Sequence, residues 1–228
     1  MKKTKIICTM GPASNTAEQM AKLIEAGMNV ARFNFSHGSH EEHLERFNNL
    51  KAARQATGKL CAILLDTKGP EIRTNDMQDN AIDLVKGATV RISMTEVLGT
   101  KDKFSVTYAN LINDVEVGSH ILLDDGLVDL LVTEIDHANQ ELVTEIQNSG
   151  VIKSKKGVNV PNVSINLPGI TEKDAADIRF GVREGIDFIA ASFVRRASDV
   201  MEIREILEQE GRPNVKIISK IENQEGVD

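Results

Sequence analysis

Residues 28–70 read MNVARFNFSHGSHEEHLERFNNLKAARQATGKLCAILLDTKGP, and this stretch decides the fold. Met28–Phe35 is an apolar run that predicts a strand, and Ser39–Ala56 carries apolar side chains at helical spacing. Gly58 predicts the end of that helix. Leu60–Asp66 is almost continuously apolar, which is typical of a strand buried on both faces. A strand, a helix and a second strand in this order indicate a parallel sheet.

The same alternation continues on both sides of this stretch. Thr4–Met10 predicts an earlier strand, and Thr16–Ala26 predicts a helix that Gly27 ends. The pattern returns after residue 167 with two more helices and two more strands. The helices are expected at Thr171–Glu184 and Ser198–Gln209, and the strands at Asp187–Phe193 and Val215–Ile221. Thr171 and Asp174 come close to a capping box at the start of the first of these helices.

Residues 74–167 have a different pattern and predict an all-β region. They hold no convincing helix, and short apolar runs alternate with turn signals. Asp124-Asp125-Gly126 and Ala138-Asn139-Gln140 are typical of hairpin turns. We therefore expect a small β domain inserted between a strand and the next helix.

The predicted fold is an incomplete (β/α)8 TIM barrel of about five strands with an inserted β domain. A complete barrel of this kind takes roughly 250 residues, more than the β-α parts of this chain supply. The expected boundaries are 1–73 for the first barrel part, 74–167 for the inserted domain and 168–228 for the continued barrel part.

Composition and charge exclude several classes of protein. Hydrophobic residues make up 41% of the 228 residues, so the chain can bury a core and is not intrinsically disordered. The formal net charge of −7 argues against a nucleic-acid partner, which would need an excess of Lys and Arg. No stretch approaches the roughly 18 apolar residues of a membrane helix, and the apolar run near the start is too short for a signal peptide. We expect a cytoplasmic protein whose two cysteines, Cys8 and Cys61, are buried free thiols.

Barrel enzymes carry their chemistry at the carboxyl ends of the strands, and polar side chains gather at the end of the second predicted strand. Side chains of a strand alternate between its two faces, so Arg32, Asn34 and Ser36 share one face. A cation beside two oxygen-bearing groups suits an anionic substrate and a metal cation that takes oxygen ligands. The alternative is a helix N-cap at Ser36 and a surface arginine.

Two further strand ends carry similar groups. Asp66 and Thr67 follow the third predicted strand and are candidates for ligands or hydrogen-bonding groups. Lys220 and Glu222 share a face at the end of the last strand, where a lysine can bind phosphate and a carboxylate can bind a metal ion. Lys220 could equally form a Schiff base, and the pair could be an internal ion pair.

Other motifs have ordinary structural explanations. Core packing accounts for Ser192 and Phe193, and for Lys68 and Glu71 a charged hinge fits as well as a functional role does. The basic pair in Lys155-Lys156-Gly157 suits phosphate, but taken alone such a pair is more often a solvated loop. Three histidines are spaced three residues apart, and we favour surface or hydrogen-bonding roles over a metal site for the second and third. They are His37, His40 and His43.

Five motifs in this sequence together resemble pyruvate kinases of the bacterial type. They are MNVARFNFSHG at Met28–Gly38, LDTKGPEIRT at Leu65–Thr74, KGVNVP at Lys156–Pro161, AASFVR at Ala190–Arg195 and IISKIENQEG at Ile217–Gly226. The resemblance covers essentially the whole chain in matching order. It implies a (β/α)8 barrel with a β-barrel lid after the third strand. It also implies phosphoryl transfer from phosphoenolpyruvate to ADP, giving pyruvate and ATP, with Mg2+ (or Mn2+) and K+ as cofactors.

The resemblance implies a role for each matching residue. Arg32 and Lys220 correspond to catalytic residues that bind the transferring phosphoryl group, and Glu222 corresponds to a Mg2+ ligand. Glu71 corresponds to an acidic position that accompanies K+ dependence. The K+ ligands correspond to Asn34, Ser36, Asp66 and Thr67, and the nucleotide-binding residues to Asn34, His37, Arg73 and Lys156.

The resemblance also implies parts of the machinery that this sequence lacks. The second Mg2+ carboxylate of the family lies in an Ala-Arg-Gly-Asp segment of the next strand, so we expect the chain alone to have little activity. The family is usually homotetrameric at full length. Two alternatives are a non-catalytic fragment that binds ligand or partner subunits, and a metal-dependent lyase or aldolase that uses Lys220 as a Schiff-base former.

Overall fold

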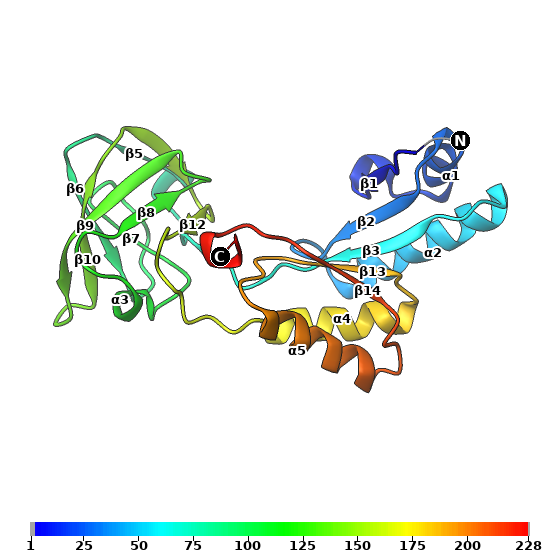
Figure 1. The fold of residues 1–228 in the computed structure, drawn as a ribbon. Helices are drawn as coiled ribbons and strands as arrows, with labels where there is room; N and C mark the ends of the chain where they lie inside the picture. The colour runs from blue at the N-terminus through cyan, green and yellow to red at the C-terminus, as the bar shows by residue number, and fades with distance from the viewer. Residues whose placement is uncertain (1–2, 228) are drawn as a thin grey trace. The chain divides into compact units, whose positions relative to one another are not determined.

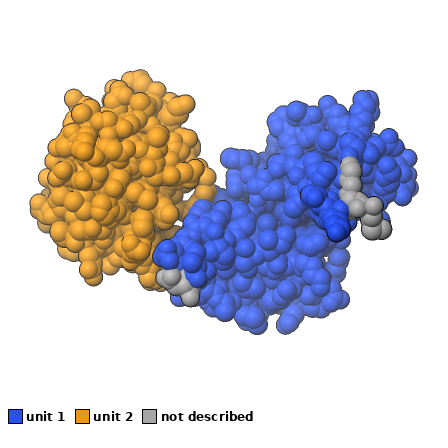
Figure 2. Space-filling model, turned by 45° about the horizontal axis from the view of Figure 1, so that its top comes forward, with its two compact units in different colours: residues 1–70, 168–228 blue, residues 71–167 orange. Residues whose placement is uncertain are grey.

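A computed structural model describes residues 3–227, and Met1, Lys2 and Asp228 lie outside the described residues. The chain forms two compact units, which Figure 2 colours separately. Unit 1 contains residues 1–70 and 168–228, and unit 2 contains residues 71–167. Among the described residues, no helix is long and apolar enough to cross a membrane.

Unit 1 is built from alternating strands and helices. In chain order they are β1 (Ile7–Thr9), η1 (Pro12–Ser14), α1 (Ala17–Ala26), β2 (Val30–Asn34), α2 (His40–Thr57), β3 (Ala62–Asp66), α4 (Glu172–Glu184), β13 (Phe188–Ala191), α5 (Ala197–Gln209), β14 (Lys216–Ser219) and α6 (Gln224–Val227). The five strands form one parallel sheet in the order β1-β2-β3-β13-β14. Helices α1, α2, α4 and α5 pack against one another in the same order (Figure 1). The prediction of a five-stranded part of a (β/α)8 barrel is confirmed.

The helices of unit 1 begin and end at the residue types that their ends require. The Ser39 hydroxyl accepts a hydrogen bond from the Glu42 backbone at the start of α2, so the predicted alternative of a cap at Ser36 is wrong. Thr171 and Asp174 form the expected capping box of α4. Gly58 ends α2 in the left-handed conformation, which glycine adopts without steric cost.

The apolar core of unit 1 lies between the sheet and its helices. Phe33 of β2 and Phe47 of α2 are fully buried and meet edge to face, with ring centroids 4.6 Å apart. His43 is buried as well, so of the two roles expected for it, at the surface or in a hydrogen bond, the structure shows the second. Its Nε2 donates to the His37 carbonyl oxygen at 2.9 Å, and its ring stacks on Phe35 with centroids 3.9 Å apart. Burial is tolerated because the ring is hydrogen-bonded and stacked rather than charged. Cys61 is buried, whereas Cys8 is only half-buried, and both are free.

Unit 2 is almost entirely β-structure. Its strands are β4 (Ile72–Arg73), β5 (Ala81–Leu84), β6 (Thr89–Ser93), β7 (Lys103–Ser105), β8 (His120–Leu123), β9 (Val128–Asp136), β10 (Glu141–Ile146), β11 (Gly150–Lys153) and β12 (Gly157–Asn159). Seven of them form a sheet in the order β4-β12-β8-β9-β10-β6-β7, and β11 pairs with β5. Hairpins join β8 to β9 and β9 to β10 at the two predicted turns.

The expectation that residues 74–167 hold no helix is wrong at one place. A single helical turn, α3 (Leu111–Asp114), buries Leu111 and Ile112 in the core of unit 2. Four residues are too few to show a helical period, so the sequence pattern could not reveal this turn. A 3-10 turn, η2 (Gln78–Asn80), also precedes β5.

Candidate functional site

The parallel sheet of unit 1 brings the carboxyl ends of its strands to one edge. Asn34 of β2 lies opposite Asp66 of β3, and Asp66 lies opposite Ala190 of β13. Ala191 in turn lies opposite Ser219 of β14, one residue before Lys220. Polar residues that are distant in sequence therefore become neighbours at this edge.

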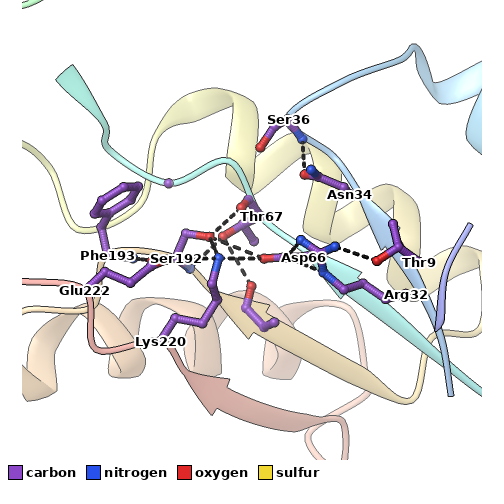
Figure 3. Close-up of polar contacts among 12 residues, drawn as sticks. Thr9, Arg32, Asn34, Ser36, Asp66, Thr67, Ser192, Phe193, Lys220 and Glu222 are labelled. Atoms are coloured by element: carbon purple, nitrogen blue, oxygen red, sulfur yellow. Dashed lines mark hydrogen bonds and ion pairs between the residues drawn. The ribbon is translucent and has the colours of Figure 1, made fainter. Parts of the chain in front are cut away.

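Asp66 is the centre of the polar contacts at this edge, and its side chain is 3% exposed (Figure 3). Arg32 Nε donates to Asp66 Oδ2 at 2.6 Å, and Arg32 Nη2 contacts the same oxygen. Lys220 Nζ donates to the other oxygen, Oδ1, at 3.1 Å. The carboxylate thus joins two cations that come from different strands. We call this set of contacts, with the neighbours described next, the Asp66 network.

Three further groups complete the Asp66 network. Thr9 Oγ1 accepts a hydrogen bond from Arg32 Nη1 at 2.7 Å. Lys220 Nζ donates to Ser192 Oγ at 2.8 Å and lies 3.5 Å from Glu222 Oε1. The Ser192 hydroxyl donates to the Thr67 carbonyl oxygen at 2.6 Å. Arg32, Asp66, Thr67, Lys220 and Glu222, all predicted as site residues, therefore lie together.

Thr9 and Ser192 belong to this site although the sequence analysis did not select them. Ser192 is buried and hydrogen-bonded on both sides, so the explanation by core packing is incomplete. Each residue is polar and lies at or just after the carboxyl end of an apolar strand. That is the signal that identified Asp66, and it could have identified these two residues.

Asn34 and Ser36 lie beside the Asp66 network but do not join it. Asn34 Oδ1 accepts a hydrogen bond from the Ser36 backbone N–H at 3.0 Å, and Ser36 Oγ makes no hydrogen bond to another described residue. Asn34, Ser36, Asp66 and Thr67 thus place amide, hydroxyl and carboxylate oxygens at one edge of the sheet. This oxygen-only donor set fits a cation such as K+, whose hydration shell protein oxygens can replace.

Glu222 supplies a single carboxylate for a divalent cation. Its Oε2 accepts the Phe193 backbone N–H at 2.9 Å, and about a third of its side chain is exposed. One carboxylate together with substrate oxygens is a common way to bind Mg2+, so Glu222 fits that ion. Among residues 3–227, no three His, Cys, Asp or Glu side chains are grouped so that they could hold a metal ion by themselves. His40 Nε2 pairs with Asp177 Oδ1 at 2.7 Å, which agrees with the hydrogen-bonding role expected for this residue.

The remaining predicted residues divide between the two units. His37 follows β2 in unit 1, where its carbonyl oxygen accepts the bond from His43. Arg73 and Lys156 lie in unit 2, where β4 pairs with β12. Arg73 Nε and Nη2 bind the two oxygens of Glu71 at 2.6 and 2.9 Å, and these hydrogen bonds raise the pKa of Arg73. Lys156 Nζ lies 3.1 Å from Asp124 Oδ1. We call Arg73, Glu71, Lys156 and Asp124 the Arg73 cluster.

Comparison with known proteins gives a consistent result. The family model "Pyruvate kinase, barrel domain" matches residues 1–228. The chain is 63% identical over its full length to curated pyruvate kinases of Staphylococcus aureus strains USA300, NCTC 8325 / PS 47 and bovine RF122/ET3-1. It spans 39% of the length of each of these relatives.

Proposed function

The chain belongs to the pyruvate kinase family, and we propose that it takes part in phosphoryl transfer from phosphoenolpyruvate to ADP. In this reaction a terminal oxygen of ADP bonds to phosphorus while the bond from phosphorus to the enol oxygen breaks. The enolate that leaves takes up a proton and becomes pyruvate, and ADP becomes ATP. The observation that carries the proposal is the pair of cations, Arg32 and Lys220, on either side of buried Asp66.

Arg32 and Lys220 have the chemistry that this transfer needs. Catalysis of phosphoryl transfer is mostly positioning and neutralisation of charge, without a covalent intermediate. The planar guanidinium of Arg32 can bind two phosphoryl oxygens at once, and the Lys220 ammonium acts as a point charge. Asp66 and Thr9 fix the guanidinium, so its orientation exists before substrate binds.

The charge balance of the Asp66 network favours added cations. Arg32 and Lys220 carry two positive charges, and Asp66 and Glu222 carry two negative charges. A phosphorylated carboxylic acid would therefore bring uncompensated negative charge to the site. Glu222 would hold Mg2+ or Mn2+, and Asn34, Ser36, Asp66 and Thr67 would hold K+. Bound cations would add positive charge beside the phosphoryl group.

The nucleotide is proposed to contact a second set of residues. Asn34 and His37 in unit 1 and Arg73 and Lys156 in unit 2 are the candidates. Glu71 holds the Arg73 guanidinium by two hydrogen bonds, so its orientation too is fixed in advance. We expect the reaction to take place in the cytoplasm, with a homotetramer as the full-length assembly.

Formation of ATP from phosphoenolpyruvate and ADP, with Mg2+ and with either K+ or Na+, tests this function. Binding of phosphoenolpyruvate, followed by 31P NMR under the same conditions, provides a second readout that does not require turnover. Turnover that is faster in K+ than in Na+ would support the reaction and the cation assignment. A folded sample that neither forms ATP nor binds phosphoenolpyruvate would contradict the proposal for this chain.

A matched pair of variants locates the effect at the site. Lys220→Met should weaken phosphoenolpyruvate binding about tenfold or more, because it removes a charge-assisted hydrogen bond. Lys216→Met removes an exposed lysine from the other end of the same strand and should leave binding unchanged. Equal effects of the two substitutions would contradict the role of Lys220.

The two alternatives from the sequence give different results in these assays. Binding of phosphoenolpyruvate without any turnover would support a chain that holds ligand without catalysis. Trapping of a substrate adduct on Lys220 by borohydride would support a Schiff-base lyase or aldolase instead.

A further inference from the structure

The two residues after β13, Ser192 and Phe193, form an irregular turn beside the end of β14. The Lys220 backbone N–H donates to the Ala191 carbonyl oxygen at 2.9 Å, and the Val194 N–H donates to the Lys220 carbonyl oxygen at 3.2 Å. In a regular parallel ladder a single residue separates two such partners, whereas here two residues do. The turn therefore contains one extra residue, as in a β-bulge, a feature that is frequent beside active sites and redirects side chains there.

Ser192 connects this turn to two strand ends at once. Its hydroxyl accepts a hydrogen bond from Lys220 Nζ at 2.8 Å and donates to the Thr67 carbonyl oxygen at 2.6 Å. Its backbone N–H donates to Thr67 Oγ1 at 3.0 Å. Because Ser192 is buried, the hydroxyl holds the lysine ammonium against a fixed part of the sheet.

The backbone conformation of Phe193 directs its N–H towards Glu222, which follows β14. It has a φ of +55°, in the left-handed region that bulky side chains rarely adopt. In this conformation its backbone N–H donates to Glu222 Oε2 at 2.9 Å (Figure 3). Surrounding structure must hold such a strained residue in place, and strain of this kind gathers at functional sites.

The loop after β3 packs against the turn and supplies that support. Gly69 has a φ of +74°, and a Cβ atom placed on it would lie 2.8 Å from Ser192 Cβ and 2.9 Å from the Ser192 carbonyl oxygen. The two backbones therefore approach more closely than any side chain at position 69 would allow. The turn is fixed by Gly69 and Thr67 on one side and contacts Lys220 and Glu222 on the other.

We propose that the Ser192–Phe193 turn is a positioning element of the site, in which the Ser192 hydroxyl fixes the Lys220 ammonium and the Phe193 N–H fixes the Glu222 carboxylate. The importance of this for catalysis rests on the proposed function, because that function makes Lys220 and Glu222 the phosphoryl-binding and metal-binding groups. The positioning itself concerns only side chains and backbone groups of this chain. It can therefore be measured without substrate, metal ion or turnover.

The first test measures the mobility of the Lys220 ammonium by 15N relaxation, with the signal assigned by its loss in Lys220→Arg. In the unmodified chain we expect this ammonium to be much more restricted than that of exposed Lys216. Ser192→Ala should make the Lys220 ammonium clearly more mobile than in the unmodified chain, although the pairing with Asp66 remains, whereas Ser192→Thr retains the hydroxyl and should preserve the restriction. Amide spectra verify that each variant is folded. An ammonium that is as restricted in Ser192→Ala as in the unmodified chain, or that is already as mobile as that of Lys216 in the unmodified chain, would overturn the role of Ser192.

The second test concerns the backbone of Phe193 and uses hydrogen exchange of its amide. Phe193→Asn and Phe193→Val both remove the ring, but asparagine tolerates the left-handed conformation and β-branched valine does not. Phe193→Asn should keep the amide protected through Glu222, whereas Phe193→Val should exchange about tenfold faster as the hydrogen bond is lost. Equal protection in the two variants would overturn the role of the Phe193 conformation.

These measurements separate this proposal from the proposed function. A restricted ammonium and a protected amide in a chain that neither forms ATP nor binds phosphoenolpyruvate would retain the positioning element and reject the function. If the chain forms ATP while Ser192→Ala leaves both the ammonium mobility and the turnover unchanged, the function stands and the positioning role of Ser192 is rejected.

Discussion

The Asp66 network and the Arg73 cluster both join cations to carboxylates, but the fold builds them in different ways. The Asp66 network connects residues 34 and 154 positions apart in the sequence around a carboxylate that is almost fully buried. The Arg73 cluster centres on Glu71, which lies two positions from Arg73 and is 11% exposed, while the Arg73, Asp124 and Lys156 side chains are about a quarter to somewhat over a third exposed.

This difference predicts different physical roles. Substitution of a buried carboxylate between two cations should lower the free energy of unfolding of its unit, because removal of any member leaves charge without a partner. Ion pairs with exposed members contribute little to stability, and solvent and salt screen them. Substitutions in the Asp66 network should therefore affect both folding and ligand binding, whereas those of the Lys156–Asp124 pair in the Arg73 cluster should affect mainly ligand binding.

The largest expected effect is that of Asp66→Asn. The substitution removes the negative charge between Arg32 and Lys220 and leaves the two cations facing each other. We expect unit 1 to lose about 3 kcal/mol of unfolding free energy, at the lower end for a broken buried pair because both cations are partly exposed. Urea unfolding followed by amide NMR signals assigned to each unit measures this loss separately for the two units.

Asp124→Asn is the matched control for that substitution. It removes the carboxylate that pairs with Lys156 in unit 2 and should cost less than about 1 kcal/mol, because the pair is partly exposed. If the two substitutions destabilise their units equally, the distinction between a buried and a screened cluster is wrong.

An effect of similar size is expected where a glycine allows close approach of the backbone to the Asp66 network. Gly69→Ala should cost about 3 kcal/mol, which combines the left-handed conformation with the collision against Ser192. Gly58→Ala has a similar φ with open space around the new Cβ, so it should cost only about 1 kcal/mol. Differential scanning calorimetry of the two variants measures the difference. A melting temperature that falls equally in both would show that the contact with Ser192 yields without cost.

Local sequence signals predicted the parts of the fold that depend on local interactions. The capping residue Thr171, the glycine Gly58 and the apolar period of α2 each specify their element without reference to distant residues. The parallel sheet followed from the order of strands and helices. The polar residues Arg32, Asp66 and Lys220 were selected by position, because parallel strands bring their carboxyl ends to one edge.

What could not be predicted depends on contacts between distant residues. The role of Ser192 arises from partners 125 and 28 positions away, and a serine after an apolar strand is common in a core. The burial of His43 depends on a carbonyl oxygen in the preceding loop and on the ring of Phe35. The left-handed conformation of Phe193 contradicts its local preference, since the contacts of the site impose it.

The smallest expected effect is a difference in acid sensitivity between the two units. Burial lowers the pKa of His43 below its ordinary value of 6.5, and its Nδ1 is buried without a hydrogen-bond partner. The unfolded chain therefore binds a proton near pH 6.5 that folded unit 1 does not bind, so unit 1 should lose stability as the pH falls below about 6.5. In unit 2, hydrogen bonds from Lys103 and then Arg91 lower the pKa of Glu141 below 4.5. That contribution is present above about pH 4.5 and is lost only as the pH falls further.

Urea unfolding of each unit at about pH 7 and about pH 5.5 measures this difference, because in the unfolded chain a histidine gains a proton in that interval and a glutamate does not. Unit 1 should be less stable at the lower pH, while the stability of unit 2 should be nearly unchanged. His43→Gln removes the titrating ring, so the fall in unit 1 should disappear even if the variant is less stable at both pH values. His137→Gln replaces an exposed histidine of unit 2 and should change neither result. If the stability of unit 1 still falls at the lower pH in His43→Gln, other groups cause its acid sensitivity. If unit 2 loses more stability than unit 1 between these two pH values, the comparison is reversed.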